Sequence, residues 1–233
     1  NGLIQRPLSM KSAIRPTGAN VTINQLIVTN CRGDLDLTNA AGNLQMLNLE
    51  TGTFRHVVVR DCYLTGSGTT RNAQMVAITN PATTTRIDIV NCYHDGNTYL
   101  FAPFTITNVP TVHLIGTVSN GLFVCSTSDS YNLAVDGIEI IACSGGLAFN
   151  NGATSKTFGI FARGIKNTAG TTLFTYGTTN TFNVTGSDGT VTLKTDTAGH
   201  TFNISTGCIL NDTQTAAAGV YAKGPTAYTR IAL

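Results

Sequence analysis

Charge is scarce in this sequence. Asp, Glu, Lys and Arg make up 11% of the 233 residues, which is less than half of the roughly 25% found in ordinary globular chains. The formal net charge is only +2 and the basic residues form no cluster, which argues against a nucleic-acid partner. No apolar run approaches the length of a membrane span, and no signal-peptide pattern opens the chain. We therefore expect neither nucleic-acid binding nor membrane insertion.

The sequence also lacks the residue spacings that are typical of metal sites and of disulfide-rich proteins. The six cysteines form no CxxC or Cys/His spacing, and no loop is rich enough in Asp to hold calcium. The chain is also long enough to build a core without disulfides. We therefore expect no metal, no cofactor, and reduced cysteines that pack as small apolar residues. Tryptophan is absent, whereas Gly, Thr, Asn and Ser are abundant, which favours a β-rich protein with many turns.

A repeated phrase organises what is present. "LIVTNC", "VVVRDC" and "IDIVNC" end at Cys31, Cys62 and Cys92, and each alternates apolar with other residues before an Asn or Asp and a Cys. Weaker copies follow: "VHLIGT" (112–117), "IEIIAC" (138–143), "IFARGI" (160–165), "FNVTGS" (182–187) and "FNISTG" (202–207). Successive copies are 20 to 31 residues apart, and a period in this range is typical of a solenoid. The alternation and the β-branched residues predict that each phrase is a strand.

Alignment of the phrases places apolar residues in two columns that would face inward. The first column is Leu26, Val57, Ile87, Val112, Ile138, Ile160, Phe182 and Phe202, and the second is Val28, Val59, Ile89, Leu114, Ile140, Ala162, Val184 and Ile204. A single coil cannot bury such a strand, so neighbouring coils must stack. This predicts an all-β, right-handed parallel β-helix of about eight coils over residues 23–210. Residues 1–22 would form an entry segment and residues 211–233 a C-terminal cap or trimer-contact segment.

Residues with turn chemistry follow the first three strands. Asn30, Asp61 and Asn91 align where each strand ends, and these residue types tolerate left-handed backbone geometry. Three segments that come after them each contain Gly: 32–34, which reads Arg-Gly-Asp, 63–68 and 93–97. We interpret all three as turns, so the Arg-Gly-Asp tripeptide belongs to the repeat and is not an adhesion signal.

One polar constellation on the outward positions could carry chemistry. Asp88, His113 and Glu139 fall at equivalent places on successive coils, which would put the two carboxylates about 9–10 Å apart across two strand spacings. Inverting glycosidases hold their two carboxyl groups about 6.5–9.5 Å apart, so these three residues are the candidate catalytic set. The alternative interpretation is a structural ladder in which His113 lies between two acids.

Other outward residues suggest ligands and partners. Tyr63, Tyr93 and Tyr99 are candidates for binding a glycan, because aromatic rings can stack on sugars. Several outward positions are large and apolar: Ile27, Val58, Val90, Ile115, Ile141 and Phe161. A monomer should not expose such a set, so either a loop or another copy of the chain is expected to cover it.

The stacked "VVVRDC" and "IDIVNC" phrases, the Asn or Asp at the turn, the low charge and the outward apolar positions resemble the pectate-lyase-like parallel β-helix, and more narrowly the bacteriophage tailspike and tail-fibre proteins. The resemblance covers roughly residues 23–210 and includes no diagnostic catalytic motif. It implies a homotrimer of side-by-side β-helices in a virion tail that acts at the bacterial surface. It also implies binding of bacterial surface polysaccharide, in many members with endoglycosidase or lyase activity.

Two other classes remain open. A secreted, monomeric polysaccharide lyase or hydrolase would normally show a richer charged cleft than 12 acidic residues spread over the chain can provide. A bacterial β-helical adhesin would normally avoid cysteine. Free cysteines are safe in a phage protein, which assembles in reducing cytoplasm. The phage receptor-binding protein is therefore the preferred hypothesis, and whether it is also an enzyme stays open.

Overall fold

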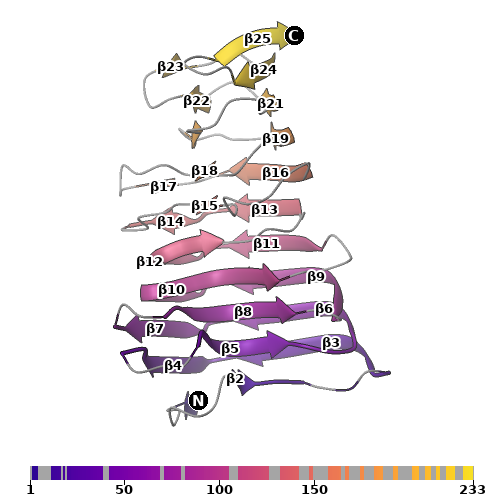
Figure 1. Cartoon of the computed structure of the whole chain (residues 1–233), viewed down its shortest axis with the longest axis vertical. Helices are drawn as coiled ribbons and strands as arrows, with labels where there is room; N and C mark the ends of the chain where they lie inside the picture. The colour runs from indigo at the N-terminus through magenta and orange to yellow at the C-terminus, as the bar shows by residue number, and fades with distance from the viewer. Residues whose placement is uncertain are drawn as a thin grey trace.

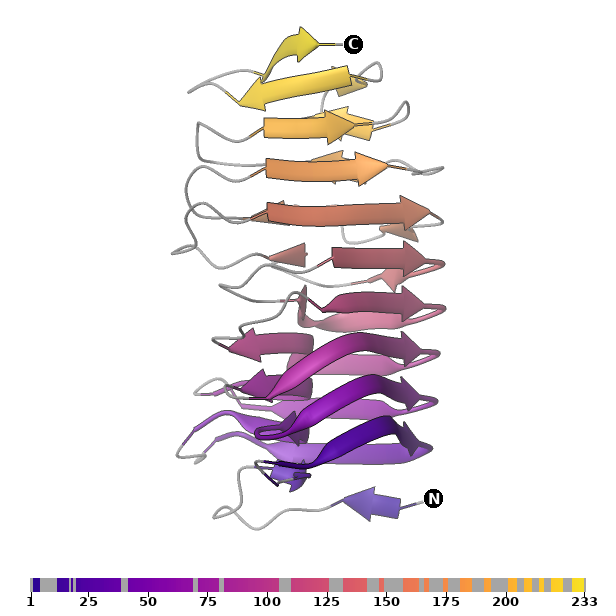
Figure 2. The same cartoon turned by 90° about the vertical axis from the view of Figure 1, so that its right-hand side faces the viewer.

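A computed structural model of the chain describes residues 2–4, 12–16, 18, 20–38, 42–68, 71–79, 82–104, 110–125 and 132–141, and beyond them the backbone of the strands from β15 to β25. All regular structure in this part of the chain is β-strand (Figure 1). The strands stack along the long axis of the molecule, with the two termini at opposite ends (Figure 2). None of the described segments is a helix long and apolar enough to cross a bilayer.

One sheet runs the whole length of the stack. Eight of its strands follow one another in sequence order and pair in parallel: β3 (Thr22–Thr29), β6 (Thr53–Arg60), β9 (Thr83–Val90), β11 (Thr111–Ile115), β13 (Asn132–Asp136), β16 (Thr157–Arg163), β19 (Thr181–Thr185) and β21 (Thr201–Ile204). Two antiparallel strands, β24 (Gly219–Lys223) and β25 (Tyr228–Ala232), then extend it. We call this ten-stranded sheet the long sheet.

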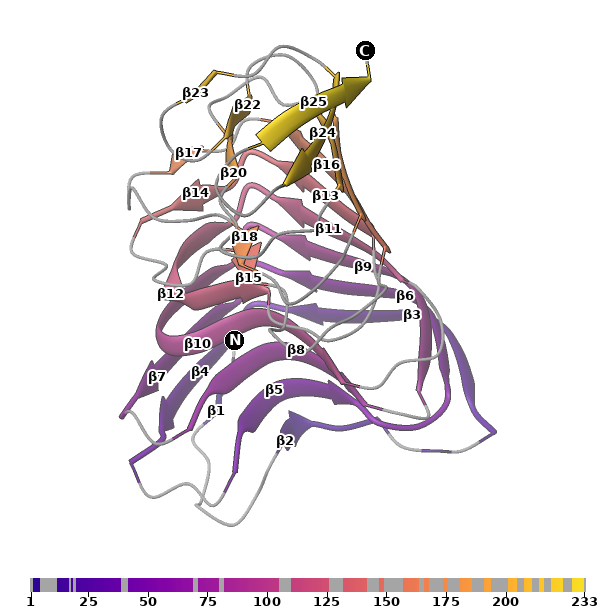
Figure 3. The ribbon, with the colours of Figure 1, turned by 45° about the horizontal axis from the view of Figure 1, so that its top comes forward.

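The second sheet lies across the core from the long sheet, and its strands fan into two branches (Figure 3). Its main path is β1 (Gly2–Ile4), β4 (Cys31–Asp36), β7 (Tyr63–Ser67), β10 (Tyr93–Phe104), β12 (Val118–Cys125), β14 (Glu139–Ile140) and β17 (Lys166–Asn167). The side branches are β2 (Ser12–Ile14), β5 (Leu44–Leu49) and β8 (Ala73–Thr79), and β15 (Leu147–Ala148) with β18 (Phe174–Thr175). A separate small sheet contains β20 (Val191–Leu193), β22 (Cys208–Leu210) and β23 (Gln214–Thr215). We call the twelve-stranded sheet the branched sheet.

The predicted inward columns form the core where their side chains are described. Val57, Ile87 and Val112 pair in register on consecutive strands of the long sheet, and each is fully buried. The column two residues later behaves in the same way, with Val59 and Ile89 at 0% exposure. Strands buried on one face in this regular way need neighbours to cover them, so the stack is the unit of stability.

A single left-handed residue makes the corner between the two sheets. Asn30, Asp61 and Asn91 have φ of 54°, 53° and 50°, which confirms the prediction for these positions, and Gly116 and Gly137 follow with φ of 57° and 68°. The corner amides bond to the adjacent coil: Asn30 N–H to Arg60 O (3.2 Å), Asp61 N–H to Val90 O (3.0 Å), Asn91 N–H to Ile115 O (2.9 Å) and Gly116 N–H to Asp136 O (2.9 Å). Asn, Asp and Gly are the residues for which this backbone region costs least.

The prediction for the fifth coil is wrong. Residues 138–141, the described part of the segment 138–143, do not continue the long sheet; β13 takes that place, with Leu133 paired to Val112. Gly137 supplies the left-handed corner after β13, so the following residues Ile138 and Ile140 turn into the branched sheet, where both remain buried. Both segments alternate apolar residues, and only the position of the corner distinguishes them.

A second register differs by two residues. Alignment of the phrases predicts Ile160 opposite Phe182, whereas the structure pairs Phe158 with Phe182 and Ile160 with Val184. A shift of two residues keeps the same set of side chains on the same face of a strand, because the side-chain period is two. The following pair, Phe182 with Phe202, agrees with the prediction.

The segments interpreted as turns are strands instead. Arg32-Gly33-Asp34 lies inside β4, residues 63–67 form β7, and residues 93–97 open β10. The glycines serve close packing between coils: a Cβ on Gly96 would overlap the carbonyl oxygen of Gly66 on the neighbouring strand. Arg32 and Asp34 form an ion pair with each other (2.8 Å) on the surface of the sheet, which gives the tripeptide a structural role.

The two terminal segments also contain strands. Within residues 1–22, β1 pairs with β4 and β2 with β5, so part of the expected entry segment already belongs to the branched sheet. Within residues 211–233, β24 and β25 add antiparallel strands to the end of the long sheet. Their role as a cap or as a trimer contact stays a prediction.

Candidate functional site

The structure separates the three predicted catalytic residues. Asp88 on β9 and His113 on β11 are direct neighbours on the outer face of the long sheet. The strand that follows β11 presents Ala134 at the equivalent position. Glu139 lies on β14 of the branched sheet, because the corner at Gly137 precedes it. The expected pair of carboxylates two strand spacings apart is therefore not formed by Asp88 and Glu139.

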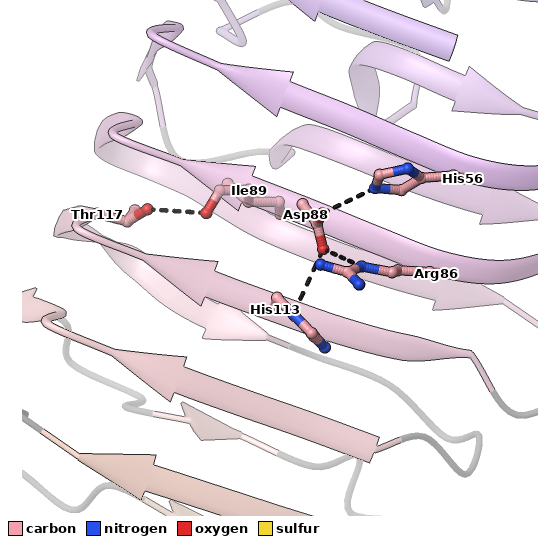
Figure 4. Close-up of polar contacts among 6 residues, drawn as sticks. All are labelled: His56, Arg86, Asp88, Ile89, His113 and Thr117. Carbon is pink, nitrogen blue, oxygen red and sulfur yellow. Dashed lines mark hydrogen bonds and ion pairs between the residues drawn. The ribbon is translucent and has the colours of Figure 1, made fainter. Parts of the chain in front are cut away.

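Asp88 is the centre of a group of four polar side chains, which we call the Asp88 cluster (Figure 4). His56 Nε2 lies 2.8 Å from one carboxylate oxygen, and Arg86 Nε donates to the other at 2.8 Å. His113 Nδ1 approaches that second oxygen at 3.5 Å. The four residues come from three adjacent strands, β6, β9 and β11, and the Asp88 side chain is only 10% exposed.

The electrostatics of the Asp88 cluster favour a structural role. Burial alone would raise the pKa of Asp88, but hydrogen bonds from Arg86 and His56 outweigh it and hold that pKa below its ordinary value. Burial, together with the nearby Arg86 charge, lowers the pKa of His113. Asp88 therefore stays ionised at neutral pH, whereas a glycosidase acid needs a raised pKa in order to donate a proton. A structural role fits this geometry better than a catalytic one, but the predicted ladder, with His113 between two acids, is not formed either, because Ala134 lies on the other side of His113.

The sequence prediction missed His56 and Arg86. In the alignment of the repeats, Arg86 stands two residues before Asp88, and His56 stands two residues before Val58, the residue that aligns with Asp88. The alignment that pointed to Asp88 therefore also places His56 and Arg86 at equivalent positions. Parallel pairing places His56 beside Arg86, and both side chains then reach Asp88 from the same face.

The predicted glycan-binding tyrosines lie on the outer face of the branched sheet. Tyr63 and Tyr93 are paired on β7 and β10, and their rings are stacked with centroids 4.9 Å apart and planes at 7°. The Arg32 guanidinium covers the other face of the Tyr63 ring at 4.8 Å. The same column continues through Val118 to Glu139, so the structure brings Glu139 onto the face of the tyrosines.

A second column of polar residues runs beside the first. Asn120 is central to it, because its side-chain amide donates to the Tyr93 hydroxyl (3.2 Å) and to Asp95 Oδ1 (3.0 Å). Asp95 Oδ1 also accepts the Gly96 N–H at 2.6 Å. We call the half-exposed surface made by these two columns the tyrosine face; it comprises Arg32, Asp34, Tyr63, Thr65, Tyr93, Asp95, Asn120 and Glu139.

Tyr99 stands apart from the other two tyrosines. It lies further along β10, opposite Gln74 of β8. Its hydroxyl accepts a hydrogen bond from the Asn72 side chain at 2.7 Å, and burial raises its pKa. Tyr99 is half-buried and is therefore less available to a ligand than the tyrosine face.

His94 is fully buried, although its segment reads as a turn in the sequence. Its Nδ1 lies 2.8 Å from Thr98 Oγ1 and its Nε2 lies 2.6 Å from Ser119 Oγ. Because the Thr98 hydroxyl donates to Asp95 O (3.1 Å), Thr98 must accept from His94 Nδ1–H, and Nε2 then accepts from Ser119. The neutral ring satisfies both nitrogens, and burial lowers the pKa of His94 to about 3. Its complete burial excludes direct contact with a large substrate.

The outward apolar positions are split between the two sheets. On the long sheet Ile27 is 50% and Ile115 36% exposed, whereas Val58 and Val90 are half-buried beside the Asp88 cluster. Ile141 follows β14 and belongs with the branched sheet instead. Phe161 on β16 is paired with Ala134 on β13, and the side chain of Phe161 lies outside the described residues. Cys143 and the side chain of Cys208 also lie outside them.

The fold defines the class of this protein as all-β with stacked parallel strands. The part of the chain that the structure describes contains no group of three or more His, Cys, Asp or Glu side chains able to hold a metal ion. No family model matches the chain, and neither the curated proteins nor the solved structures contain a significant match to it. Function must therefore be argued from the residues themselves.

Replacement of Asp88 with Asn is expected to lower the free energy of unfolding by about 1–2 kcal/mol, because hydrogen bonds to a charged group are among the stronger ones. Asp61→Asn makes the same change of charge at a corner where Asn30 and Asn91 already occur, so its effect should stay within about 0.5 kcal/mol. Urea unfolding of both variants measures the difference. Equal losses in the two variants would show that the Asp88 cluster contributes nothing specific.

Proposed function

We propose that this chain is a right-handed parallel β-helix of about eight coils from a phage tailspike or tail fibre, and that it binds bacterial surface polysaccharide from the virion tail. Eight parallel strands in sequence order, the first five of them followed by a one-residue corner that leads into a second sheet, support this architecture. Free thiols at Cys31, Cys62, Cys92 and Cys125 fit a protein that assembles in a reducing compartment.

The observation that carries the proposal is the tyrosine face. Its side chains repeat from one strand to the next, at a spacing of about 4.8 Å, which is close to the length of one sugar unit in an extended polysaccharide. Stacked Tyr63 and Tyr93 are held upright by each other and by Arg32, so they present ring edges and hydroxyls to a ligand. A rigid aromatic surface loses little entropy on binding.

The polar groups of the tyrosine face indicate which polysaccharides it would accept. Asp34 is paired with Arg32, and the Asp95 carboxylate, which accepts from Asn120 and from the Gly96 N–H, adds a negative charge to the surface. A polyanionic glycan would be repelled, so a neutral or amino-sugar polymer is the better ligand. Asn120 orients both Tyr93 and Asp95, which fixes the donors and acceptors that read sugar hydroxyls.

Binding without cleavage is the activity that the described residues support best. Catalysis by two carboxyl groups requires one of them to hold a proton at neutral pH. Asp88 is kept ionised by Arg86 and His56, and Glu139 lies on another sheet. Depolymerase activity is therefore a second outcome to be measured in the same assay.

The proposal includes a homotrimer. Ile27 and Ile115 are exposed on the outer face of the long sheet, with Val58 and Val90 half-buried between them. A second and third copy of the chain would cover these side chains and remove them from water. The Asp88 cluster lies among them and would then be enclosed at the subunit contact, where its hydrogen bonds already satisfy the carboxylate.

The test is binding to a panel of immobilised bacterial surface polysaccharides, with reducing ends assayed in parallel and the mass of the protein measured by light scattering. Tyr93→Ala should weaken binding at least tenfold, and Tyr93→Phe should weaken it less, because Phe keeps the stack and loses only the hydroxyl that Asn120 contacts. Gly42→Ala, which lies outside both the tyrosine face and the proposed subunit contact, should bind as the wild type does.

Each part of the proposal can fail separately. If the protein bound none of the polysaccharides in the panel, the proposed receptor-binding function would be contradicted. Equal binding by the wild type and Tyr93→Ala would move the site away from the tyrosine face. A solution mass of one chain would contradict the trimer, and a mass near three chains would support it.

A further inference from the structure

Three cysteines form a ladder on the inner side of the corner. Cys31, Cys62 and Cys92 each follow a left-handed corner residue, and the corner amides of successive coils are hydrogen-bonded in register. We call these three residues the thiol ladder. The next coil carries Thr117 at the same place, where its hydroxyl lies 3.3 Å from Ile89 O (Figure 4) and 3.2 Å from Ile115 O.

The thiols point along the stack toward the preceding coil. Cys62 Sγ lies 3.2 Å from Arg60 O in its own strand and 3.8 Å from Val28 O in the coil before. Cys92 Sγ repeats the arrangement, at 3.3 Å from Val90 O and 3.5 Å from Val59 O. The Cys62 sulfur is therefore directed toward the coil that carries Cys31, and the Cys92 sulfur toward the coil that carries Cys62.

The spacing of the coils suits a disulfide between neighbours in the ladder. Adjacent strands of a sheet are about 4.8 Å apart, and the Cα atoms of disulfide-bonded cysteines are usually 4.4–6.8 Å apart. Cys62 lies between two possible partners, and only one bond can form. Cys31 is partly exposed, whereas Cys62 and Cys92 are each 2% exposed, so an oxidant from solution meets Cys31 first.

We propose that Cys31 and Cys62 are a redox pair that closes to a disulfide between adjacent coils when the chain meets a small-molecule disulfide such as oxidised glutathione. The Cys31 thiolate attacks one sulfur of the oxidant, forms a mixed disulfide and releases one glutathione thiolate. The Cys62 thiolate then attacks Cys31 Sγ and expels the second glutathione thiolate. Two protein thiols are oxidised and one oxidised glutathione is reduced to two molecules of glutathione.

Burial and the neighbouring Cys62 raise the pKa of Cys31, so the first step depends on the exposure of Cys31 and not on an activated thiolate. The electrostatics of Cys62 bear on the second step. A hydrogen bond from the Cys92 thiol lowers the pKa of Cys62 to about 7, against the opposing effect of burial. The same hydrogen bond, together with burial, raises the pKa of Cys92, which keeps its proton. Cys62 is therefore the sulfur that can supply a thiolate for the second step.

Formation of this disulfide does not depend on the proposed function. The benefit suggested for it, a covalent link that forms after release from the cell, does rest on that function. A chain that assembles in reducing cytoplasm and then acts outside the cell would gain a covalent link only after release. The link would join two coils near the N-terminal end of the stack, where β1 pairs with β4 at the level of Cys31.

The experiment treats the reduced full chain with oxidised glutathione, traps remaining thiols with an alkylating agent, and maps the peptides by mass spectrometry. The expected product has a Cys31–Cys62 linked peptide, four alkylated cysteines out of six, and a higher midpoint of urea unfolding than the reduced chain. Cys62→Ser should instead hold glutathione on Cys31 as a stable mixed disulfide. Cys92→Ser and Cys125→Ser should both retain the linked peptide.

Three results would overturn the proposal. The first is six free thiols in the treated wild type while denatured protein reacts normally. The second is a glutathione adduct on Cys31 of the wild type that never resolves, which would show that Cys62 cannot reach it. The third is a linked peptide that joins Cys62 to Cys92. All three are read on the wild-type chain, so they hold even if a cysteine variant fails to fold.

Discussion

The free energy of unfolding of the wild-type chain is expected to fall by about 2 kcal/mol between pH 7 and pH 5 through His94 alone. His94 is fully buried and neutral, with both ring nitrogens hydrogen-bonded, and burial lowers its pKa to about 3 from an ordinary 6.5. Between these two values the unfolded chain binds a proton that the folded chain does not. Stability is therefore complete above about pH 6.5 and declines as the pH falls toward 3.

Urea unfolding at half-unit steps from pH 7 to pH 4.5 measures this slope. His94→Gln removes the titrating ring, so its curve should be nearly flat over the same range, although its stability at pH 7 will be lower because the contacts to Thr98 and Ser119 change. His113→Gln is the matched control, since His113 is partly exposed and should leave most of the slope in place. A slope that is equal in wild type and His94→Gln would contradict the assignment.

Replacement of Gly96 with Ala is expected to cost about 3 kcal/mol of stability, from about 1–2 kcal/mol for a left-handed non-glycine residue and a similar amount for overpacking. Gly96 has φ of 72°, and a Cβ there would overlap the carbonyl oxygen of Gly66. The overlapping atom belongs to the backbone of a paired strand, so it cannot move aside as a flexible side chain would.

The chain supplies its own control for this substitution. A Cβ on Gly42 would meet nothing within 4 Å, so Gly42→Ala should be neutral or slightly stabilising. Urea midpoints and slopes of the two variants give the comparison under identical conditions. If both variants unfolded at the same midpoint, close approach of the coils at Gly96 would not be a constraint on this fold.

Much of the long sheet can be predicted from the sequence, because its signal is repeated. The alternation around Val57, Ile87 and Val112 predicts that these segments are strands, which side chains face the core, and how neighbouring strands align. The polar residues at 30, 61 and 91 predict where each strand ends in a corner. Each copy supports the others, so a weak local preference becomes a strong collective one.

The branched sheet could not be predicted in the same way. Its strands β4, β7 and β10 begin one or two residues after the corner and contain Gly33, Gly66 and Gly96, and glycine in a sequence usually indicates a turn. Here glycine allows neighbouring backbones to approach, which is a property of the stack and invisible in one coil. The same interpretation placed His94 in a turn, whereas it lies in β10 and is fully buried.

The candidate site was predicted only in part. Asp88 and His113 are adjacent as expected, but His56 and Arg86 complete the Asp88 cluster from positions two residues before the outward column that was considered. Glu139 was predicted on the long sheet but lies on the branched sheet. The reason is that Gly137 makes the corner before residues 138–143, the phrase that was aligned as a strand of the long sheet. A one-residue feature decides which face each later side chain occupies.

The one-residue corner also determines where such a chain can change in length. The corner residues Asn30, Asp61, Asn91, Gly116 and Gly137 are separated by 31, 30, 25 and 21 residues, yet the corner itself is the same each time. At Asn30, Asp61, Asn91 and Gly116 the corner N–H is bonded to the adjacent coil, so an added residue would break that bond. The difference in length between coils therefore lies outside the corner. A foreign peptide grafted between β4 and β5 should therefore be tolerated, whereas the same graft at Asp61 should not.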